Sequence, residues 1–483
     1  MSEDLEQKEL PEGWTDATLK DISSYIQRGK SPKYTEFSEL PVVNQKCVRW
    51  EGIDKEYVKY IHPEQFEKWE AKRFLKEGDL LWNSTGTGTI GRATIAHLKL
   101  GEKLVVDSHV TIVRPAKGIE PKYVYYWIMS PVVQNSIEEM QSGSTNQVEL
   151  SKSAVESTPI PVAPPEQQKQ IVAKIEQLFS HIDAGIEALN TAKQRLKQYR
   201  QSVLKAAVTG ELSKEWREAN KEKLEPASQL LERILQTRRQ KWEEQQLEQF
   251  KAKGKAPKND KWKEKYNEPK SNNDQALFNI PDEWDWVYVA QLGNVVGGLT
   301  KNKKREQFEL QLPYLRVANV YSNELRLDDV TFIGVQENEL ERVLLEEGDL
   351  LIVEGNGSPD QIGRLAIWDA SINPCVHQNH LIKVRLALKE SGKYLMYWLT
   401  SLGGRDAILK VASSTSGLYT LSISKISGLS VPLPPLREQL EIAEQVSIKL
   451  TAIERLNKDI DIQLLKAEKN KQSILALAFK GEL

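Results

Sequence analysis

Two short basic segments carry the side chains best suited to binding phosphate. The first is RGKSPKY at 28–34 and the second is KNKKR at 301–305. Each follows an apolar run, as a loop follows a strand. Lysine and arginine contact the phosphate oxygens of nucleic acids. We therefore predict phosphate contacts from Arg28, Lys30, Lys33 and Tyr34 in the first segment and from Lys301, Lys303, Lys304 and Arg305 in the second.

A second set of polar residues follows each basic segment and has the groups that read bases. Asparagine and glutamine can bond adenine through two hydrogen bonds, and arginine can bond guanine in the same way. An interpretation as ordinary polar residues at strand ends is equally open. The residues concerned are Asn44, Gln45, Lys46 and Arg49 in the first half of the chain and Arg316, Asn319 and Tyr321 in the second.

The sequence shows no motif for catalysis, nucleotide binding or metal binding. A P-loop is absent, and the histidines form no HxxxH or HExxH pair. The string closest to the base-gripping loop of an amino-methyltransferase is Asn373-Pro374-Cys375, which lacks the second proline and the aromatic residue. The glycines of GTGTIG at 86–91 are replaced by GNGSP at 355–359, which indicates a variable loop rather than a phosphate cradle. We predict no catalytic residue, no metal and no cofactor bound by this chain.

The charge balance is unusual for a protein that binds nucleic acid. The net charge is −2 and the isoelectric point is near 6.4. Residues 1–165 and 278–436 each sum to about −4, and residues 213–273 sum to about +5. Because nucleic-acid-binding domains are usually basic, contacts with DNA would depend on local basic patches, and a partner could supply the rest.

Composition excludes several other classes. Hydrophobic residues make up 40% of the 483 residues, enough for packed cores. No apolar run approaches the roughly 18 residues of a membrane span, and MSEDLEQKEL does not resemble a secretory signal. The two cysteines, Cys47 and Cys375, fit no metal-ligand spacing. We expect a cytoplasmic protein without membrane association.

The chain repeats itself at an offset of about 270 residues. The matches keep one order along both halves, which chance similarity seldom does, so the sequence predicts an internal duplication. Trp127 and Trp398 lie on matched apolar faces and are expected in the cores. The matching blocks are LPEGW and IPDEW, LKEGDLLW and LEEGDLLI, TIGRATIA and QIGRLAIW, KYVYYW and KYLMYW, PIPVAPPEQQ and SVPLPPLREQ, and RQSVLKAAVTGEL and KQSILALAFKGEL.

Each half starts with about 150 residues of short apolar runs and ends with a long helix. A proline-rich segment, 159–165 in the first half, separates the two. Apolar residues then follow a heptad pattern from Ile171 to Ala206 and, in the second half, from Ile442 to Leu477. Gly185, Lys449, Gln463 and Asn470 are weak positions in these seams. About 42 helical residues span roughly 60 Å, and antiparallel pairing of the two helices would place one globular domain at each end.

A charged segment joins the halves. Residues 227–250 have helical periodicity, and prolines 257 and 269 interrupt the rest. We interpret it as a solvated linker helix in preference to a basic arm that touches DNA.

The block order, the proline-rich segments PIPVAPPEQQ and SVPLPPLREQ, and the endings AVTGEL and AFKGEL resemble the specificity subunits of type I restriction–modification systems over nearly the whole chain. The first proline-rich segment departs from the pattern by one alanine, Ala163, where the second has Pro434.

The resemblance implies an α+β fold with two α/β target recognition domains, separated by two long helices that form an antiparallel coiled coil with a pseudo-two-fold duplication. Such subunits read a bipartite asymmetric DNA site, and their helices set the spacer. Two methyltransferase subunits methylate adenine N6 with S-adenosylmethionine, and two restriction subunits use ATP and Mg. The expected divisions are target recognition domain 1 at 1–165, helical spacer 1 at 166–212, the charged linker at 213–277, target recognition domain 2 at 278–436 and helical spacer 2 at 437–483.

Further candidate contacts lie in loops between the matched blocks. The residues in these loops are Asn83, Thr85 and Thr87 in the first half and Asn356 and Ser358 in the second. The stretches that contain Thr145, Asn146 and Thr415 resemble the Gly/Thr-rich turn of the family, which implies that they position the backbone against phosphate.

Two other function classes stay open. A coiled-coil scaffold without DNA contact predicts that no preferred DNA sequence is bound. A fused enzyme fragment predicts that the purified chain modifies or cuts DNA unaided.

Overall fold

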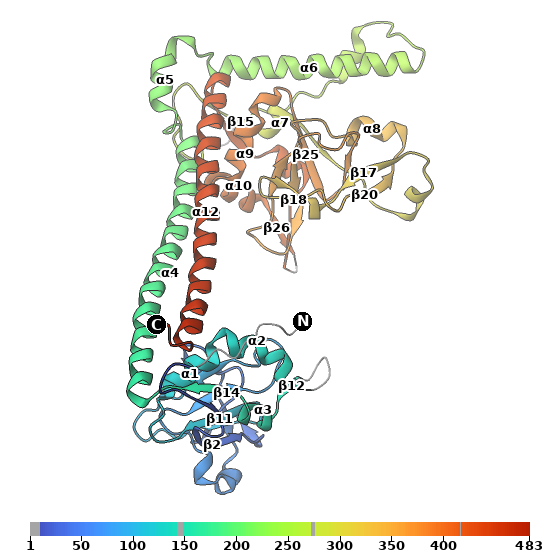
Figure 1. The fold of residues 1–483 in the computed structure, drawn as a ribbon. Coiled ribbons are helices and arrows are strands. Elements are labelled where there is room, and N and C mark those ends of the chain that lie inside the picture. The colour runs from blue at the N-terminus through green and yellow to red at the C-terminus, as the bar shows by residue number, and fades with distance from the viewer. Residues whose placement is uncertain (1–9, 143–147, 272–275, 416) are drawn as a thin grey trace. The chain divides into compact units, whose positions relative to one another are not determined.

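The computed structural model describes residues 10–142, 148–271, 276–415 and 417–483. The chain divides into two compact units: unit 1 holds residues 1–192 and 459–483, and unit 2 holds residues 193–458. Each unit combines one sheet-containing domain with segments of both long helices, α4 (Pro165–Val208) and α12 (Leu436–Ala478) (Figure 1).

The domain of unit 1 is built on a four-stranded antiparallel sheet in the order β2-β11-β8-β9. The strands β8 and β9 are buried on both faces, and so are the first four residues of β11. Leu80 and Trp82 of β8 belong to the core that includes the helix α1, whereas Leu81 belongs to the core that includes residues of a second sheet, of order β10-β4-β7-β3. This alternation follows from the two-residue period of a strand.

The elements of unit 1 before α4 are β1 (Thr15–Thr18), β2 (Ser23–Arg28), β3 (Tyr34–Thr35), β4 (Pro41–Val43), β5 (Val48–Arg49), β6 (Gly52–Ile53), β7 (Lys59–Ile61), β8 (Leu80–Asn83), β9 (Ala93–Ile95), β10 (Val105–Val106), β11 (Val110–Pro115), α1 (Pro121–Met129), α2 (Pro131–Met140), β12 (Gln141–Ser142), β13 (Glu149–Leu150), α3 (Lys152–Glu156) and β14 (Pro159–Val162).

The domain of unit 2 repeats this plan. Its four-stranded sheet has the order β16-β25-β21-β23, and a second sheet has the order β20-β17-β24. Leu350 and Ile352 of β21 belong to the core that includes α9, whereas Leu351 belongs to the core on the other face. The predicted duplication is therefore confirmed in the order of elements as well as in the sequence.

The elements of unit 2 between the long helices are α5 (Lys214–Asn220), α6 (Ala227–Ala252), β15 (Asp285–Tyr288), α7 (Val289–Leu292), β16 (Gly293–Gly297), β17 (Gln311–Leu315), β18 (Val320–Tyr321), β19 (Glu324–Leu325), β20 (Thr331–Gly334), α8 (Glu337–Val343), β21 (Leu350–Val353), β22 (Gly355–Asn356), β23 (Leu365–Ile367), β24 (Val376–His377), β25 (Leu381–Leu386), α9 (Gly392–Thr400), α10 (Leu402–Val411), β26 (Ser413–Thr415), β27 (Leu418–Thr420), α11 (Ile423–Ser427) and β28 (Ser430–Leu433).

The matched tryptophans lie in the cores, as predicted. Trp127 of α1 and Trp398 of α9 are buried. Each indole nitrogen donates to a backbone carbonyl of the strand that precedes a long helix: Trp127 to Pro159 at 2.7 Å, and Trp398 to Ser430 at 3.1 Å. Satisfying the indole N–H in this way is what allows a tryptophan to be buried completely.

The two proline-rich segments lead into the long helices by the same contact. The strand β14 pairs antiparallel with β1, and β28 pairs with β15. The amide of Gln168 then donates to the carbonyl of Ala163 at 2.7 Å, and the amide of Gln439 donates to the carbonyl of Pro434 at 2.8 Å. The exchange of proline at 434 for alanine at 163 preserves this contact, because the glutamine side chain bonds only the backbone carbonyl of that residue.

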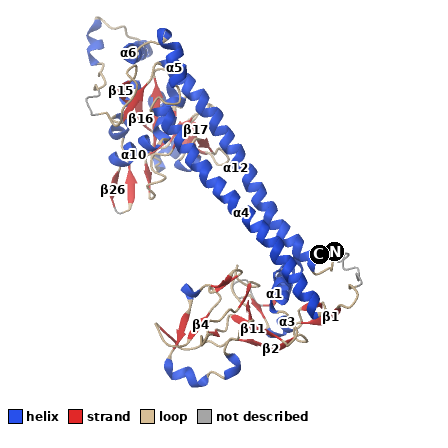
Figure 2. Cartoon of the chain, turned by 90° about the vertical axis from the view of Figure 1, so that its left-hand side faces the viewer, coloured by secondary structure: helices blue, strands red, loops and turns tan. Residues whose placement is uncertain are grey.

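The helices α4 and α12 pair in opposite directions in each unit. In unit 1, Asp183 lies 2.5 Å from Lys471, and in unit 2, Arg200 lies 3.8 Å from Glu454. The residue numbers rise along one helix as they fall along the other, which is the antiparallel pairing expected of this coiled coil. Both helices are drawn from a second side in Figure 2.

The seam of the coiled coil departs from the predicted heptad at alternate positions. Ile453 and Ile460 of α12 are buried as expected. Leu456, however, is 50% exposed, and in α4 Tyr199 is 47% exposed. At weak positions such as Lys449, the neighbour Leu450 is the buried residue. The reason is that apolar residues at i, i+4, i+7 and at i, i+3, i+7 fit a helix equally well, and the residues that pack against the helix, from the domain as well as from the partner helix, decide between them.

The charged linker packs on the domain of unit 2. Leu230 and Ile234 of α6 are part of its core. Trp242 of α6 stacks on Trp262 with ring centroids 5.9 Å apart, so the segment after α6 folds back on the helix. Among the described residues, no helix is apolar enough over a membrane-spanning length.

Candidate nucleic-acid interface

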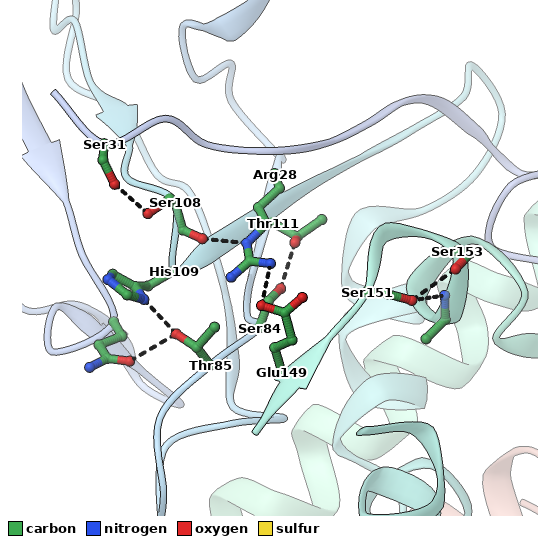
Figure 3. Close-up of polar contacts among 12 residues, drawn as sticks. Arg28, Ser31, Ser84, Thr85, Ser108, His109, Thr111, Glu149, Ser151 and Ser153 are labelled. Carbon is green, nitrogen blue, oxygen red and sulfur yellow. Dashed lines mark hydrogen bonds and ion pairs between the residues drawn. The ribbon is translucent and has the colours of Figure 1, made fainter. Parts of the chain in front are cut away.

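In unit 1, three loops leave the central sheet at the same edge. The strands β2 and β8 end at Arg28 and Asn83, and β11 begins at Val110. Arg28 pairs with Thr111 of β11, and Asn83 pairs with Val110. Because neighbouring antiparallel strands run in opposite directions, the ends of β2 and β8 meet the start of β11. We call this side of the sheet the loop edge of unit 1 (Figure 3).

Arg28 ties the loops of this edge together. Its Nε donates to the carbonyl of Ser108, and its Nη1 lies 3.0 Å from a carboxylate oxygen of Glu149. The hydroxyls of Ser31 and Ser108 are 2.6 Å apart. Arg28, which the sequence predicts to contact phosphate, thus also links its own segment to the turn at Ser108 and to the strand at Glu149.

A second group of contacts centres on Thr85. Its hydroxyl oxygen lies 2.7 Å from Nδ1 of His109 and 3.3 Å from Oε1 of Gln45. The amide of Asn83 donates to the backbone carbonyl of Gln45 at 3.0 Å. Below them, the hydroxyls of Ser84 and Thr111 are buried 2.5 Å apart. The sequence candidates Gln45, Asn83 and Thr85 are therefore brought together. Arg28 and Thr85 lie at the same edge of the sheet (Figure 3).

The remaining candidates of unit 1 include several exposed side chains. Tyr34 lies 3.4 Å from a carboxylate oxygen of Asp107, and burial together with that carboxylate raises the pKa of Tyr34 to about 12. Lys33 is 3.5 Å from Glu64, in a pair open to solvent. Arg49 is half-buried, 3.6 Å from Asp54. The exposed candidates are Lys30, Lys33, Tyr34, Lys46 and Thr87.

Unit 2 has a loop edge at the corresponding place. The strands β16 and β21 end at Gly297 and Val353, and β25 begins at Leu381. In the turn before β25, Nδ1 of His380 lies 3.1 Å from a carboxylate oxygen of Glu354, the residue that follows β21. Asn356 forms β22, which pairs with β27. Ser358 lies two residues further along, and its backbone N–H donates to the side chain of Asn356.

The basic segment of unit 2 divides into free and paired side chains. Lys301, Lys303 and Lys304 are exposed. The guanidinium of Arg305 instead makes two hydrogen bonds to the carboxylate of Glu339, at 2.7 and 2.9 Å. Within the segment 301–305, no ion pair with another described residue is found for the three lysines, whereas Arg305 is paired with Glu339.

Several predicted base contacts already bond within the protein. The amides of Asn44 and Asn319 are buried and donate to backbone carbonyls, Asn44 to that of Tyr57 at 2.6 Å. Arg316 is 2.6 Å from Asp329. Tyr321 has the guanidinium carbon of Arg326 over its ring, 3.8 Å from the centroid. These contacts hold the loops of the two edges in place.

Three candidates concern the Gly/Thr-rich turns. Thr145 and Asn146 lie outside the described residues. Thr415 ends β26, which pairs with β27 as a hairpin, and β22 joins the same small sheet. The strand β27 therefore lies beside β22, in the segment that follows β21.

The matched histidines are the functional candidates that sequence reasoning missed. His109 and His380 occupy the same place in the turn before β11 and β25, and both are exposed. The offset of 271 residues between them, within the repeat, was the available signal. A neutral or charged imidazole can donate a hydrogen bond to a base edge or to a phosphate.

The two edges do not share one pair of side chains that could act as a catalytic dyad. A hydroxyl–imidazole pair such as Thr85 and His109 occurs in catalytic dyads, but the second edge has the carboxylate of Glu354 at that place. Burial raises the pKa of Cys47 to about 11 and that of Cys375 to about 12, so both thiols stay protonated near neutral pH. Among the described residues, no three His, Cys, Asp or Glu side chains are grouped as metal ligands would be.

A duplicated domain that presents different polar loops from the same sheet edge, joined by paired helices, defines a protein with two recognition modules. The chain belongs to the family described as the type I restriction modification DNA specificity domain, whose sequence model matches residues 11–194 and 281–466. It is therefore a specificity subunit of the type I restriction–modification kind, which recognises DNA.

Individual relatives agree with this assignment over the whole length. The chain is 24% identical to the type I restriction enzyme EcoKI specificity subunit of Escherichia coli (strain K12), covering 98% of this chain and 90% of the relative. Identity and coverage are the same for the StySPI specificity subunit of Salmonella potsdam.

Solved structures show the same fold. A chain from a study of complex assembly and conformational transition of the type I R-M system aligns with a TM-score of 0.66 at 16% identity, covering 99% of this chain and 100% of that one. The HsdS subunit from Thermoanaerobacter tengcongensis aligns with a TM-score of 0.54 at 15% identity, covering 99% of both chains.

Proposed function

We propose that this chain is the non-catalytic specificity subunit of a type I restriction–modification complex, and that each domain reads one half of a bipartite asymmetric DNA site. The observation that carries the proposal is the pair of loop edges. They have matching strands and a matching histidine but different neighbours, Thr85 in one and Glu354 in the other. Equal scaffolds with unequal polar groups would bind two different half-sites.

Phosphate contacts fall to the exposed basic residues of these edges. Lys30, Lys33 and Lys46 serve the first half-site, and Lys301, Lys303 and Lys304 serve the second. Each of the two domains carries a net negative charge of about −4, so these lysines act as local patches. Partner subunits that surround the DNA supply the remaining charge.

The paired helices set the spacer between the half-sites and dock two methyltransferase subunits for adenine N6 methylation. S-adenosylmethionine is held by those subunits, and ATP and Mg by two restriction subunits. The complex acts on double-stranded DNA in the cytoplasm. The family assignment and the antiparallel pairing of α4 with α12 support this division of tasks.

The test is to express the chain with its methyltransferase subunit in a host that lacks adenine methylation and to map N6-methyladenine across the genome. The expected result is one asymmetric motif with two specific parts separated by a fixed number of unspecified bases. Methylation without a sequence motif, or modification by the chain alone, would contradict the proposal.

A variant at one loop edge sharpens this experiment. Thr85→Val removes the hydroxyl that bonds Gln45 and His109 and keeps the size of the side chain. We expect the first half-site to become less specific while the second is unchanged. Thr94→Val, also within unit 1 but away from the loop edge, is the control and leaves both half-sites as they are.

A further inference from the structure

A groove of about 430 Å³ lies in unit 1 where the first proline-rich segment meets the end of the chain. Its lining includes Glu12, Trp14 and Gln167 from the first repeat and Ala478 and Gly481 from the second. The indole nitrogen of Trp14 donates to Oε1 of Gln167 at 2.9 Å. Among the described residues, no acceptor bonds Nε2 of Gln167, which is exposed.

Unit 2 has matching residues at the equivalent place. At the offset of 271 residues, Gln167 corresponds to Glu438, and Gly481 corresponds to Gly210. Both glycines have left-handed backbones and a proline against them. An added Cβ would lie 2.4 Å from Cγ of Pro11 at Gly481 and 2.5 Å from Cγ of Pro281 at Gly210. The two grooves are therefore built from matching residues in matching conformations.

In unit 2 the groove is filled by the chain itself. The residues after Gly210 turn into α5, and the hydroxyl of Ser213 donates to Glu438 at 2.7 Å. Arg217 of α5 donates to the same carboxylate oxygen at 2.6 Å and to the carbonyl of Gly210 at 3.1 Å. The indole of Trp284 completes the set, 2.9 Å from the other oxygen of Glu438.

Filling changes the exposure of these residues completely. Glu438 and Ser213 are fully buried, and Trp284 is buried as well. In unit 1, Gln167 is exposed and Trp14 is only half-buried. The groove of unit 1 thus has the shape and the polar group that receive a helical segment in unit 2, and no described segment occupies it.

The charges of the two grooves select different occupants. In unit 2, Glu438 and Glu283 face Arg217, and Glu283 also lies 3.5 Å from Lys221. In unit 1, the neutral Gln167 and Gly13 stand at the places of these two acids. The groove of unit 1 therefore has no carboxylate at either position that binds Arg217 in unit 2 and offers an amide there instead. Glu12, which also lines the groove, stands at the place of Asp282, and Arg217 pairs with Glu438 and Glu283 rather than with Asp282.

We propose that the groove of unit 1 seats the first turn of a helix from a partner protein, in the way that unit 2 seats its own residues 213–217. The partner segment presents a serine or threonine that accepts from Nε2 of Gln167. At the place of Arg217 it carries a neutral amide side chain, because an arginine there would be desolvated without the two carboxylates that bind Arg217 in unit 2.

Two synthetic peptides test this on the full chain. One has the sequence of residues 213–224, SKEWREANKEKL, and the other is identical except for Arg217→Gln. The wild-type chain is expected to bind the glutamine peptide more tightly than the arginine peptide. Gln167→Glu restores the acid of unit 2 and is expected to reverse the preference by at least about tenfold, since a buried charged hydrogen bond is worth that much.

The site of binding is read from Trp14. In a chain labelled with 5-fluorotryptophan, the ¹⁹F resonance of Trp14, assigned with Trp14→Phe, shifts on addition of the bound peptide. Gln177→Glu adds the same charge at an exposed position of α4 outside the groove and keeps the wild-type preference. The proposal is overturned if neither peptide moves the Trp14 resonance, or if Gln167→Glu leaves the peptide preference unchanged.

Discussion

Nδ1 of His109 lies 2.7 Å from the hydroxyl of Thr85, whereas Nδ1 of its counterpart, His380, lies 3.1 Å from the carboxylate of Glu354. The imidazoles occupy the same turn of the same sheet edge in the two repeats. Their neighbours differ in charge and in hydrogen-bonding capacity. This difference is what two readers of unlike half-sites require, and it sets the first prediction.

Replacing either histidine with alanine is expected to weaken recognition of one half-site only. We predict a loss of about 1–3 kcal/mol in binding to DNA that contains that half-site, the usual range for a specific contact. Electrophoretic mobility shifts with the assembled methyltransferase measure this on DNAs mutated in one half-site at a time. His97→Ala is the control, because His97 is exposed near the opposite edge of the sheet and bonds Glu77. Equal losses at both half-sites would contradict the assignment.

The exposed lysines of the second basic segment are expected to govern the salt dependence of binding. Lys303→Ala with Lys304→Ala should lower the slope of log Kobs against log[salt] by about 2, because each phosphate contact contributes about one. Lys389→Ala with Lys393→Ala removes the same charge from the helical end of that domain. An unchanged slope in the first variant would exclude these lysines as phosphate contacts.

Each repeat has a buried ion pair at the matching place, but only the arginine of unit 2 has a second carboxylate within reach. Arg114 lies 2.7 Å from Asp79, and Arg385 lies 2.7 Å from Asp349 but also 2.5 Å from Glu346. Asp79→Asn leaves Arg114 without a carboxylate and is expected to destabilise unit 1 by about 3 kcal/mol. Asp349→Asn should cost less, since Glu346 still pairs with Arg385. Urea denaturation followed by hydrogen exchange in each unit checks the order.

His377 makes the stability of unit 2 depend on pH. Burial, and secondarily the charge of Lys383, lowers the pKa of His377 to about 3 from its ordinary 6.5. Between these values the unfolded chain binds a proton that the folded chain does not, so stability falls as the pH is lowered through this window. The slope is about 1.4 kcal/mol per pH unit below pH 6.

The variant that tests this prediction is His377→Val. Valine is chosen because Val106 occupies the corresponding position of unit 1. The unfolding free energy of the wild type minus that of the variant should fall steadily as the pH is lowered from about 6 to 4. Parallel stability curves for the two proteins would show that His377 does not titrate in this range.

Lengthening the coiled coil is expected to lengthen the spacer of the DNA site. A heptad inserted after Asn190 in α4 and another after Gln463 in α12 keep the pairing that joins Asp183 to Lys471 and Arg200 to Glu454. Seven residues add about 10 Å, the length of about three base pairs. Methylation mapping should find both half-sites unchanged and a longer spacer, and an unchanged spacer would rule out the helices as the ruler.

The sequence by itself determined the architecture of this protein. The matched blocks predicted the duplication, the apolar periodicity predicted α4 and α12, and the faces of α1 and α9 predicted that Trp127 and Trp398 are buried. These features depend on local patterns of apolar residues, and such patterns are written along the chain because burial is the main force that orders it.

Only the tertiary structure decided which polar side chains are available to a ligand. Arg305 and Lys304 are neighbours in the sequence, but only Arg305 is paired with Glu339, which lies 34 residues further along the chain. Asn44 and Asn319 look like base readers until the carbonyls of distant turns bond them. Likewise, the residues that pack against α12 decided that Leu450 is buried where the heptad pattern points to Lys449. Polar contacts between remote segments have no period in the sequence, so folding alone brings His109 to Thr85 and leaves Gln167 open.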